Sequence, residues 1–113
     1  QVRDKFNPDT VYICSPQVHQ DHSVAFDECL RAFKTQNIYC YELPWNDVNT
    51  HITGTSEITA EQLEKKLKAL AQYQSQKEKS YFNPAFTESL AIVRGIQARC
   101  EFAEALTIVR HKI

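Results

Sequence analysis

The chain has 113 residues, of which 42% are hydrophobic and 24% are charged, and its formal net charge at pH 7 is −1. These values are typical of a soluble globular protein, and the length limits it to a single domain. The basic residues are scattered, which argues against a nucleic-acid partner or an anionic membrane surface. No apolar run approaches the roughly 20 residues of a membrane helix, and the first residues lack the order of a signal peptide, so we expect a cytoplasmic protein.

The first residues favour a longer parent polypeptide. The sequence begins with Gln1 and contains no methionine. Its residues up to Phe6 have the pattern of the end of a helix, which enters a turn at Asn7, Pro8 and Asp9. We therefore expect this chain to be the later part of a longer protein.

The four cysteines are widely spaced, at Cys14, Cys29, Cys40 and Cys100. Three of them fall in apolar segments, and no CxxC pair points to a zinc ribbon or a redox motif. Buried, reduced thiols are common in cytosolic proteins. The spacing therefore predicts free thiols rather than a disulfide framework.

A strand, a polar loop, a helix and a second strand are predicted in the first part of the chain. Thr10 to Ser15 is rich in β-branched and aromatic residues, which suits a strand buried on both faces of a parallel sheet. Ser23 to Lys34 has the apolar spacing of a helix that packs on a sheet, and Asn37 to Leu43 is β-prone. We expect the two strands to pair in parallel in a largely parallel sheet, with the helix as their crossover.

A polar segment and a helix follow. Trp45 to Glu57 is too long for a simple connection and predicts a surface or substrate-facing loop. A patch of threonines within it is able to form a short edge strand. Thr59 and Gln62 have the spacing of a capping box at the start of a helix from Ala60 to Tyr73.

The last part of the chain predicts another helix and a strand. Asn83 followed by Pro84 is an N-cap and first-turn pair, and the helix that they open runs toward Arg99. Gly95 lies inside this helix, where glycine costs about 1 kcal/mol relative to alanine, so a close contact or a break is expected there. Ala105 to Arg110 is a β-prone run.

The densest group of ligand-type side chains is His19, Asp21 and His22, which we expect in the loop between the first strand and the first helix. Ligands of open α/β sheets bind at the carboxyl ends of strands. Imidazole and carboxylate bind zinc, and a carboxylate beside a histidine stabilises its protonated form. The spacing alone is equally consistent with a structural interpretation, in which Asp21 caps the helix and both histidines are solvated.

Other titratable residues have weaker claims to a functional role. His51 and His111 are isolated in the sequence, and we expect neither to be functional. Glu42 stands at the end of a predicted strand and Glu104 stands beside one, where solvated or capping carboxylates are ordinary.

Several short elements occur along the chain in a definite order. They are the PxxHxDH element of Pro16, His19, Asp21 and His22, the pair Tyr41-Glu42, a lysine-rich helix leading to Tyr73 to Gln76, the pair Arg94-Gly95, and Ala103 to Ala105. This order resembles the later half of the LmbE-like, or PIG-L, family of zinc-dependent N-deacetylases. The resemblance covers nearly the whole chain.

The resemblance implies a Rossmann-like, three-layer α/β domain with a parallel sheet and one catalytic zinc ion, present here as its later half. It implies that His22 is a zinc ligand and that His19 stabilises the oxyanion and assists departure of the amine, while Asp21 orients His19. The implied substrate is an N-acetylated amino sugar or glycoconjugate of the N-acetylglucosamine type, whose acetyl group is removed by hydrolysis.

The sequence also departs from the family. The His-Pro-Asp-Asp-Glu motif, which supplies the other two zinc ligands and the general base, is absent, so we expect the chain alone to bind zinc weakly. A glycine expected shortly after Arg94-Gly95 is missing, with Arg99 and Cys100 in its neighbourhood, and Trp45 to Thr55 matches least. Two functions stay open: part of a zinc deacetylase, or a non-catalytic α/β module that acts in packing or homo-oligomerisation.

Overall fold

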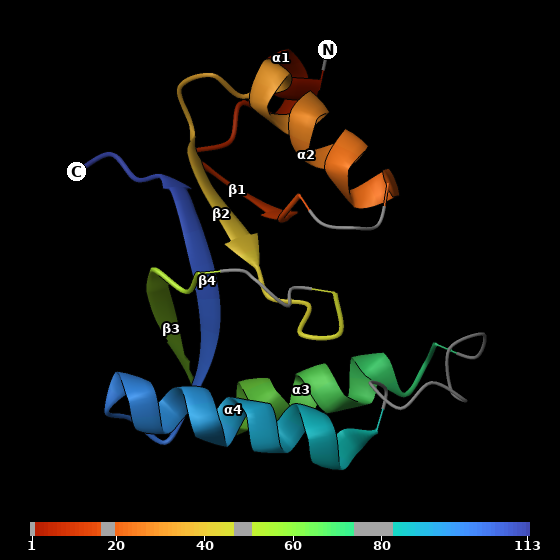
Figure 1. Cartoon of the computed structure of the whole chain (residues 1–113), viewed down its shortest axis with the longest axis vertical. Helices are drawn as coiled ribbons and strands as arrows, with labels where there is room; N and C mark the ends of the chain where they lie inside the picture. The colour runs from red at the N-terminus through yellow and green to blue at the C-terminus, as the bar shows by residue number, and fades with distance from the viewer. Residues whose placement is uncertain (1, 17–19, 47–50, 74–82) are drawn as a thin grey trace. The chain divides into compact units, whose positions relative to one another are not determined.

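The computed structural model describes residues 2–16, 20–46, 51–73 and 83–113. The elements are, in chain order, α1 (Val2–Phe6), β1 (Thr10–Cys14), α2 (Gln20–Ala32), β2 (Asn37–Tyr41), β3 (Gly54–Ile58), α3 (Ala60–Leu70), α4 (Pro84–Ala98) and β4 (Phe102–Arg110) (Figure 1). The strands form one mixed sheet in the order β1-β2-β4-β3. The chain is therefore an α/β protein, and none of the helices in the described ranges has the length and apolarity to cross a membrane.

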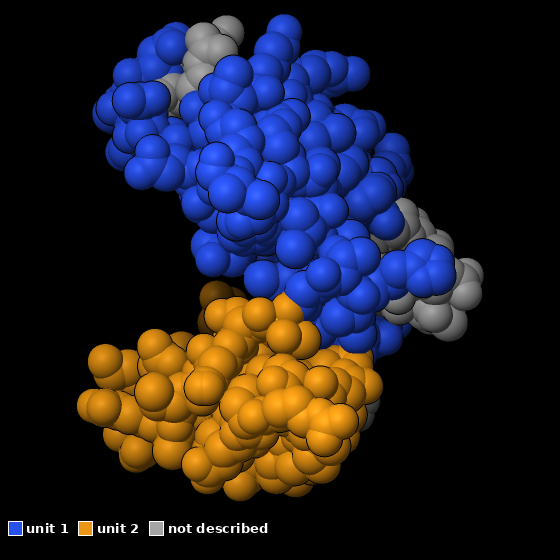
Figure 2. All heavy atoms as spheres, turned by 90° about the vertical axis from the view of Figure 1, so that its left-hand side faces the viewer, with its two compact units in different colours: residues 1–54, 105–113 blue, residues 55–104 orange. Residues whose placement is uncertain are grey.

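The chain divides into two compact units, which Figure 2 shows in different colours. The first comprises residues 1–54 and 105–113, and the second comprises residues 55–104. The helices α1 and α2 belong to the first unit, and α3 and α4 belong to the second.

In the first unit, β1 and β2 form a parallel pair with α2 between them in the sequence. The register runs from Thr10 opposite Asn37 to Cys14 opposite Tyr41 without a shift. The helix α2 packs against β1. The predicted parallel pairing and its crossover helix are confirmed.

The expectation of a largely parallel sheet is wrong for the last strand. β4 pairs with β2 in the antiparallel direction, with Tyr39 opposite Ile108 and Cys40 opposite Thr107. A β-prone run has the same composition whichever way it points, so the sequence of β4 carries no signal for its direction.

The start of α2 also differs from the prediction. The helix begins at Gln20, so Asp21 and His22 lie in its first turn rather than in a loop. The apolar spacing begins only at Val24, because the first turn is polar and gives no periodic signal. An acidic side chain in the first turn is favourable beside the positive end of the helix dipole.

The core of the first unit is small and contains thiols. Ile38 and Cys40 of β2 are the least exposed large side chains, at 0% and 2%. Cys14 and Cys29 are buried as well. None of the chain's four cysteines forms a disulfide, which confirms the expectation of reduced thiols.

In the second unit, the starts of both helices are confirmed. The Thr59 hydroxyl accepts a hydrogen bond from the Gln62 amide at 3.1 Å, and the Gln62 side chain accepts one from the Thr59 amide at 2.9 Å, which completes a capping box. The Asn83 side chain accepts a hydrogen bond from the Ala85 amide at 2.9 Å at the start of α4. The short edge strand that the threonine-containing segment allowed is β3.

The turn that ends α4 explains why position 95, inside the helix, is a glycine. The Cys100 amide donates to the Gly95 carbonyl at 2.9 Å and the Arg99 amide donates to the Ile96 carbonyl at 3.3 Å, which is the pattern of a Schellman motif. This turn folds the following chain back over Gly95, where a Cβ atom would lie 2.8 Å from the Cys100 carbonyl oxygen and still closer to that of Glu101. The close contact expected at Gly95 is confirmed.

Arg99 is the residue of this turn that has a left-handed backbone, with φ 65° and ψ 38°. Glycine is the usual residue there because it has no Cβ to crowd the carbonyl. We expect Arg99→Gly to raise the free energy of unfolding by about 0.5–1 kcal/mol, measured by urea denaturation. Arg99→Ala is the matched control, since it removes the same side chain but keeps Cβ, and an equal gain from alanine would contradict the backbone explanation.

Candidate functional site

The predicted site residues lie where β1 gives way to α2. β1 ends at Cys14, and Asp21 and His22 occupy the first turn of α2. His19, the third predicted residue, lies outside the described residues. Because β1 and β2 are parallel, the carboxyl ends of both strands lie at the same edge of the sheet as this turn.

A thiol links the end of the strand to His22. The Cys14 Sγ lies 3.7 Å from the His22 carbonyl oxygen, to which it donates a hydrogen bond. Cys14 is 5% exposed, and His22 is half-buried. Sulfur is a weak donor, so this contact positions the backbone of His22 more than it stabilises the fold. Only the backbone carbonyl of His22 accepts this hydrogen bond, and the imidazole takes no part in it.

Tyr41 contributes a hydroxyl at the same edge. It lies opposite Cys14 in the register of β1 and β2, and the Cys14 side chain is close enough to influence the Tyr41 hydroxyl. Burial raises the pKa of the Tyr41 hydroxyl, and the neighbouring Cys14 raises it further. Tyr41 is 40% exposed, so near neutral pH it offers a protonated hydroxyl that solvent or a ligand can reach.

Cys29 lies on α2 and completes this group of buried thiols. Burial raises the pKa of the Cys29 thiol, the neighbouring Cys14 raises it further, and the charge of Arg110 opposes both effects. A thiol with a raised pKa is a poor nucleophile and a poor metal ligand at neutral pH, because both tasks need the thiolate. Burial and a raised pKa are typical of a thiol that packs in a protein core.

The sequence did not single out Cys14 as part of the site. Cys14 was interpreted as a buried thiol, and this is confirmed. Its hydrogen bond to the His22 backbone could not be predicted, because it depends on how α2 turns back over the strand. The available signal was positional, since Cys14 is the last residue of the strand that precedes the histidine element.

The described residues do not form a complete zinc site. Within residues 2–16, 20–46, 51–73 and 83–113, no three histidine, cysteine, aspartate or glutamate side chains come together as metal ligands. The donor set that the structure does place, His22 with Asp21 beside it, fits one imidazole ligand of a larger set.

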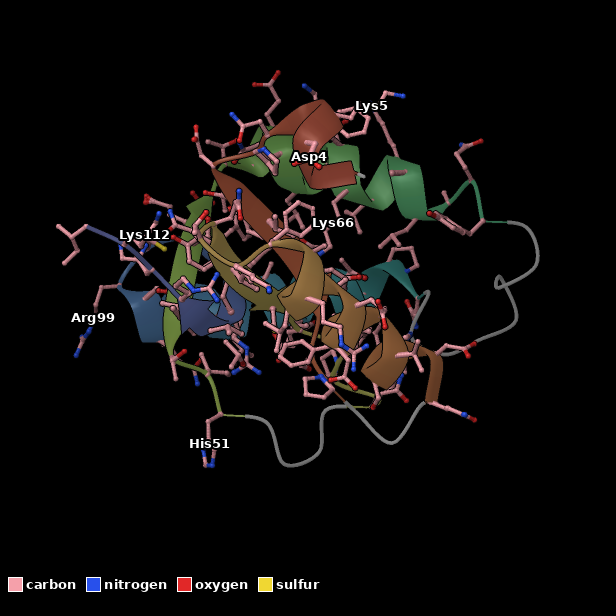
Figure 3. All side chains as sticks on the ribbon, turned by 90° about the horizontal axis from the view of Figure 1, so that it is seen from above. Asp4, Lys5, His51, Lys66, Arg99 and Lys112 are labelled. Carbon is pink, nitrogen blue, oxygen red and sulfur yellow. The ribbon has the colours of Figure 1, made fainter. Side chains whose placement is uncertain are left out.

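The other titratable residues with a possible functional role take part in contacts that support the fold. Figure 3 shows the side chain of His51 directed away from the ribbon, and its backbone carbonyl accepts a hydrogen bond from the Thr107 hydroxyl at 2.8 Å. The ring of His111 shares a hydrogen bond with the Tyr39 hydroxyl. Glu104 forms an ion pair with Lys66 at 3.1 Å, at a partly exposed position in the second unit.

A polar hollow of about 270 Å³ lies in the first unit. It is lined by the residues just before β1, the residues before and at the start of β2, and Lys112, namely Asn7, Pro8, Asp9, Thr35, Gln36, Asn37 and Lys112. These residues lie at the amino ends of the two strands, whereas Asp21 and His22 follow the carboxyl end of β1. The hollow is therefore separate from the predicted site.

Comparison with protein-family models, with curated proteins and with solved structures found no match to this chain.

Proposed function

We propose that this chain is part of a zinc-dependent N-deacetylase of the LmbE-like type, which removes the acetyl group from an N-acetylglucosamine-type amino sugar. The observation that carries the proposal is the position of Asp21 and His22. They occupy the first turn of the helix that follows β1, at the carboxyl end of a parallel strand pair. That edge is where α/β folds place their ligands.

The end of α4 gives further support. The family resemblance leaves a glycine missing shortly after Arg94-Gly95. Arg99 takes the left-handed backbone that glycine favours, four residues after Gly95. A left-handed residue close to the position of the missing glycine is compatible with the proposed resemblance.

In this proposal each side chain of the site has a separate role. His22 holds the metal, and zinc when bound supplies a Lewis acid that polarises the acetamide carbonyl. His19 donates a hydrogen bond to the oxygen that becomes negative and gives a proton to the departing amine. Asp21 holds His19 in the tautomer that this requires. The Tyr41 hydroxyl, protonated and at the same edge, is available to hydrogen-bond a sugar hydroxyl.

The test uses the native protein that contains this chain. Its intact mass shows whether a further segment is present, and acetate release from an N-acetylglucosamine derivative, with zinc supplied, measures the activity. A parent about twice this length that releases acetate, and loses that activity to a chelator, is the expected result. A native product of this length with no acetate release would contradict the proposal and favour a non-catalytic packing or oligomerisation module.

A further inference from the structure

Hydrogen bonds hold together the walls of the polar hollow at the amino ends of β1 and β2. The Asn37 amide donates to the Asp9 carbonyl at 3.0 Å, and the Lys112 amide donates to the Asn37 side-chain oxygen at 2.7 Å. The Arg110 guanidinium donates to the Gln36 carbonyl at 2.9 Å. These bonds join the three segments that line the hollow, so its shape is set by the chain itself, as in most small-molecule sites.

A buried amide lines this hollow with only part of its hydrogen-bonding capacity used. Gln36 is 8% exposed, and its side-chain oxygen accepts hydrogen bonds from the Thr35 amide at 3.3 Å and the Thr35 hydroxyl at 3.5 Å. The backbone amide can only donate, which identifies this acceptor atom as the oxygen. The side-chain nitrogen of Gln36 has no acceptor in the part of the chain that the structure describes. A buried N–H without an acceptor is unfavourable, and a ligand oxygen in the hollow would satisfy it.

Two opposite charges line the same hollow. Asp9 and Lys112 are both exposed, and Lys112, which follows β4, is labelled in Figure 3. Neither forms an ion pair with the other or with any further residue that the structure describes. A ligand that carries one negative and one positive group would therefore find an opposite charge for each.

We infer that this hollow binds a free α-amino acid with a small polar side chain. Such a molecule carries a carboxylate and an ammonium group on one carbon. Lys112 and the Gln36 side-chain nitrogen donate to the carboxylate, and Asp9 accepts from the ammonium group. The Asn37 side-chain oxygen already accepts from the Lys112 amide, so its N–H groups are the ones left for a polar side chain of the ligand.

Size and charge favour this ligand over others. A volume of about 270 Å³ lies just below the usual range of drug-sized ligand sites and suits a small metabolite. An uncharged sugar would leave Asp9 and Lys112 without an opposite charge, and an inorganic phosphate ion would be repelled by Asp9. The hollow is separate from Asp21 and His22, so the inference goes beyond the proposed enzymatic function and does not depend on it.

The test is isothermal titration calorimetry of the chain with L-serine and two analogues, and saturable binding of L-serine is expected. Glycerate has a hydroxyl in place of the ammonium group, and L-serinamide has an amide in place of the carboxylate. Each is expected to bind about tenfold or more weakly, because each loses one charged hydrogen bond. The inference is overturned if L-serine shows no saturable binding, if glycerate binds as tightly, or if inorganic phosphate binds more tightly.

Two variants test the charged residues. Asp9→Asn and Lys112→Gln each remove a charge but keep the backbone atoms that bond Asn37, so the walls of the hollow stay in place. Each is expected to raise the Kd for L-serine about tenfold. Asp27→Asn and Lys65→Gln make the same charge changes at exposed positions outside the hollow and are expected to leave the Kd nearly unchanged. Equal weakening by these controls would overturn the inference, because net charge alone would then explain the effect.

The buried amide gives a further measurement that needs no variant. In two-dimensional NMR spectra, the side-chain amide resonances of Gln36 are expected to shift with added L-serine along the saturation curve that calorimetry gives. Those of Gln62, whose side chain bonds the Thr59 amide outside the hollow, are the control and should not move. Binding of L-serine that leaves the Gln36 resonances unchanged would place the ligand elsewhere on the chain and overturn the inference.

Discussion

Gly95→Ala is expected to lower the free energy of unfolding of the second unit by about 1–3 kcal/mol, the usual cost of forcing an extra carbon into a packed position. In an ordinary helix the same change would be stabilising by about 1 kcal/mol. Here the added Cβ would lie 2.8 Å from the Cys100 carbonyl oxygen and 2.7 Å from the Glu101 carbonyl carbon. Both are backbone atoms of the turn that ends α4, so neither can turn away as a side chain would.

The matched control is Gly54→Ala, at the chain's second glycine. Its Cβ would lie 2.8 Å from Ile108 Cδ1, the mobile end of a partly exposed side chain, which can change rotamer. Urea denaturation followed by far-UV circular dichroism should therefore show a smaller loss for Gly54→Ala than for Gly95→Ala. A stabilised Gly95→Ala variant would mean that the chain after α4 does not fold back over the helix.

The second large effect concerns the histidines of the proposed enzyme, measured in the native parent protein. His22→Ala should remove a zinc ligand and lose both bound zinc and turnover. His19→Ala should keep zinc nearly intact but lower kcat by about a hundredfold or more, the usual scale for losing one oxyanion-stabilising donor. Asp21→Asn should behave like His19→Ala, because it disturbs the tautomer of the imidazole that Asp21 orients.

Metal analysis beside a deacetylation assay on an N-acetylglucosamine derivative separates these outcomes. His111→Ala is the control, because it removes an imidazole that is exposed and bonded to Tyr39 outside the site, and it should change neither quantity. If His19→Ala loses zinc as fully as His22→Ala, then His19 is a metal ligand and another residue must stabilise the oxyanion.

Local sequence features predicted the starts of α3 and α4 and the first strand pair. The capping box of Thr59 and Gln62 and the N-cap at Asn83 are decided by side chains that bond the backbone two or three residues away, so the signal lies within one turn. The parallel pairing of β1 with β2 follows from a strand, a helix and a strand in succession. The boundaries were less accurate, since α2 begins with a polar turn that has no apolar period.

The candidate site was predictable in composition but not in its contacts. Asp21 and His22 were found because two ligand-type residues stand together after a β-prone run. The hydrogen bond from Cys14 to the His22 backbone joins residues that are 8 positions apart. The pairing of Tyr41 with Cys14 joins residues that are 27 positions apart. No short sequence window contains both partners of the second pair.

The sequence by itself determined the identity and order of the strands and helices, because propensity, caps and turn residues act over a few neighbouring positions. Only the tertiary structure decided the antiparallel direction of β4, the strand order of the sheet and the requirement for glycine at position 95. Each of these depends on which backbone groups from distant parts of the chain come within contact distance. The type of a single residue does not reveal which distant groups those are.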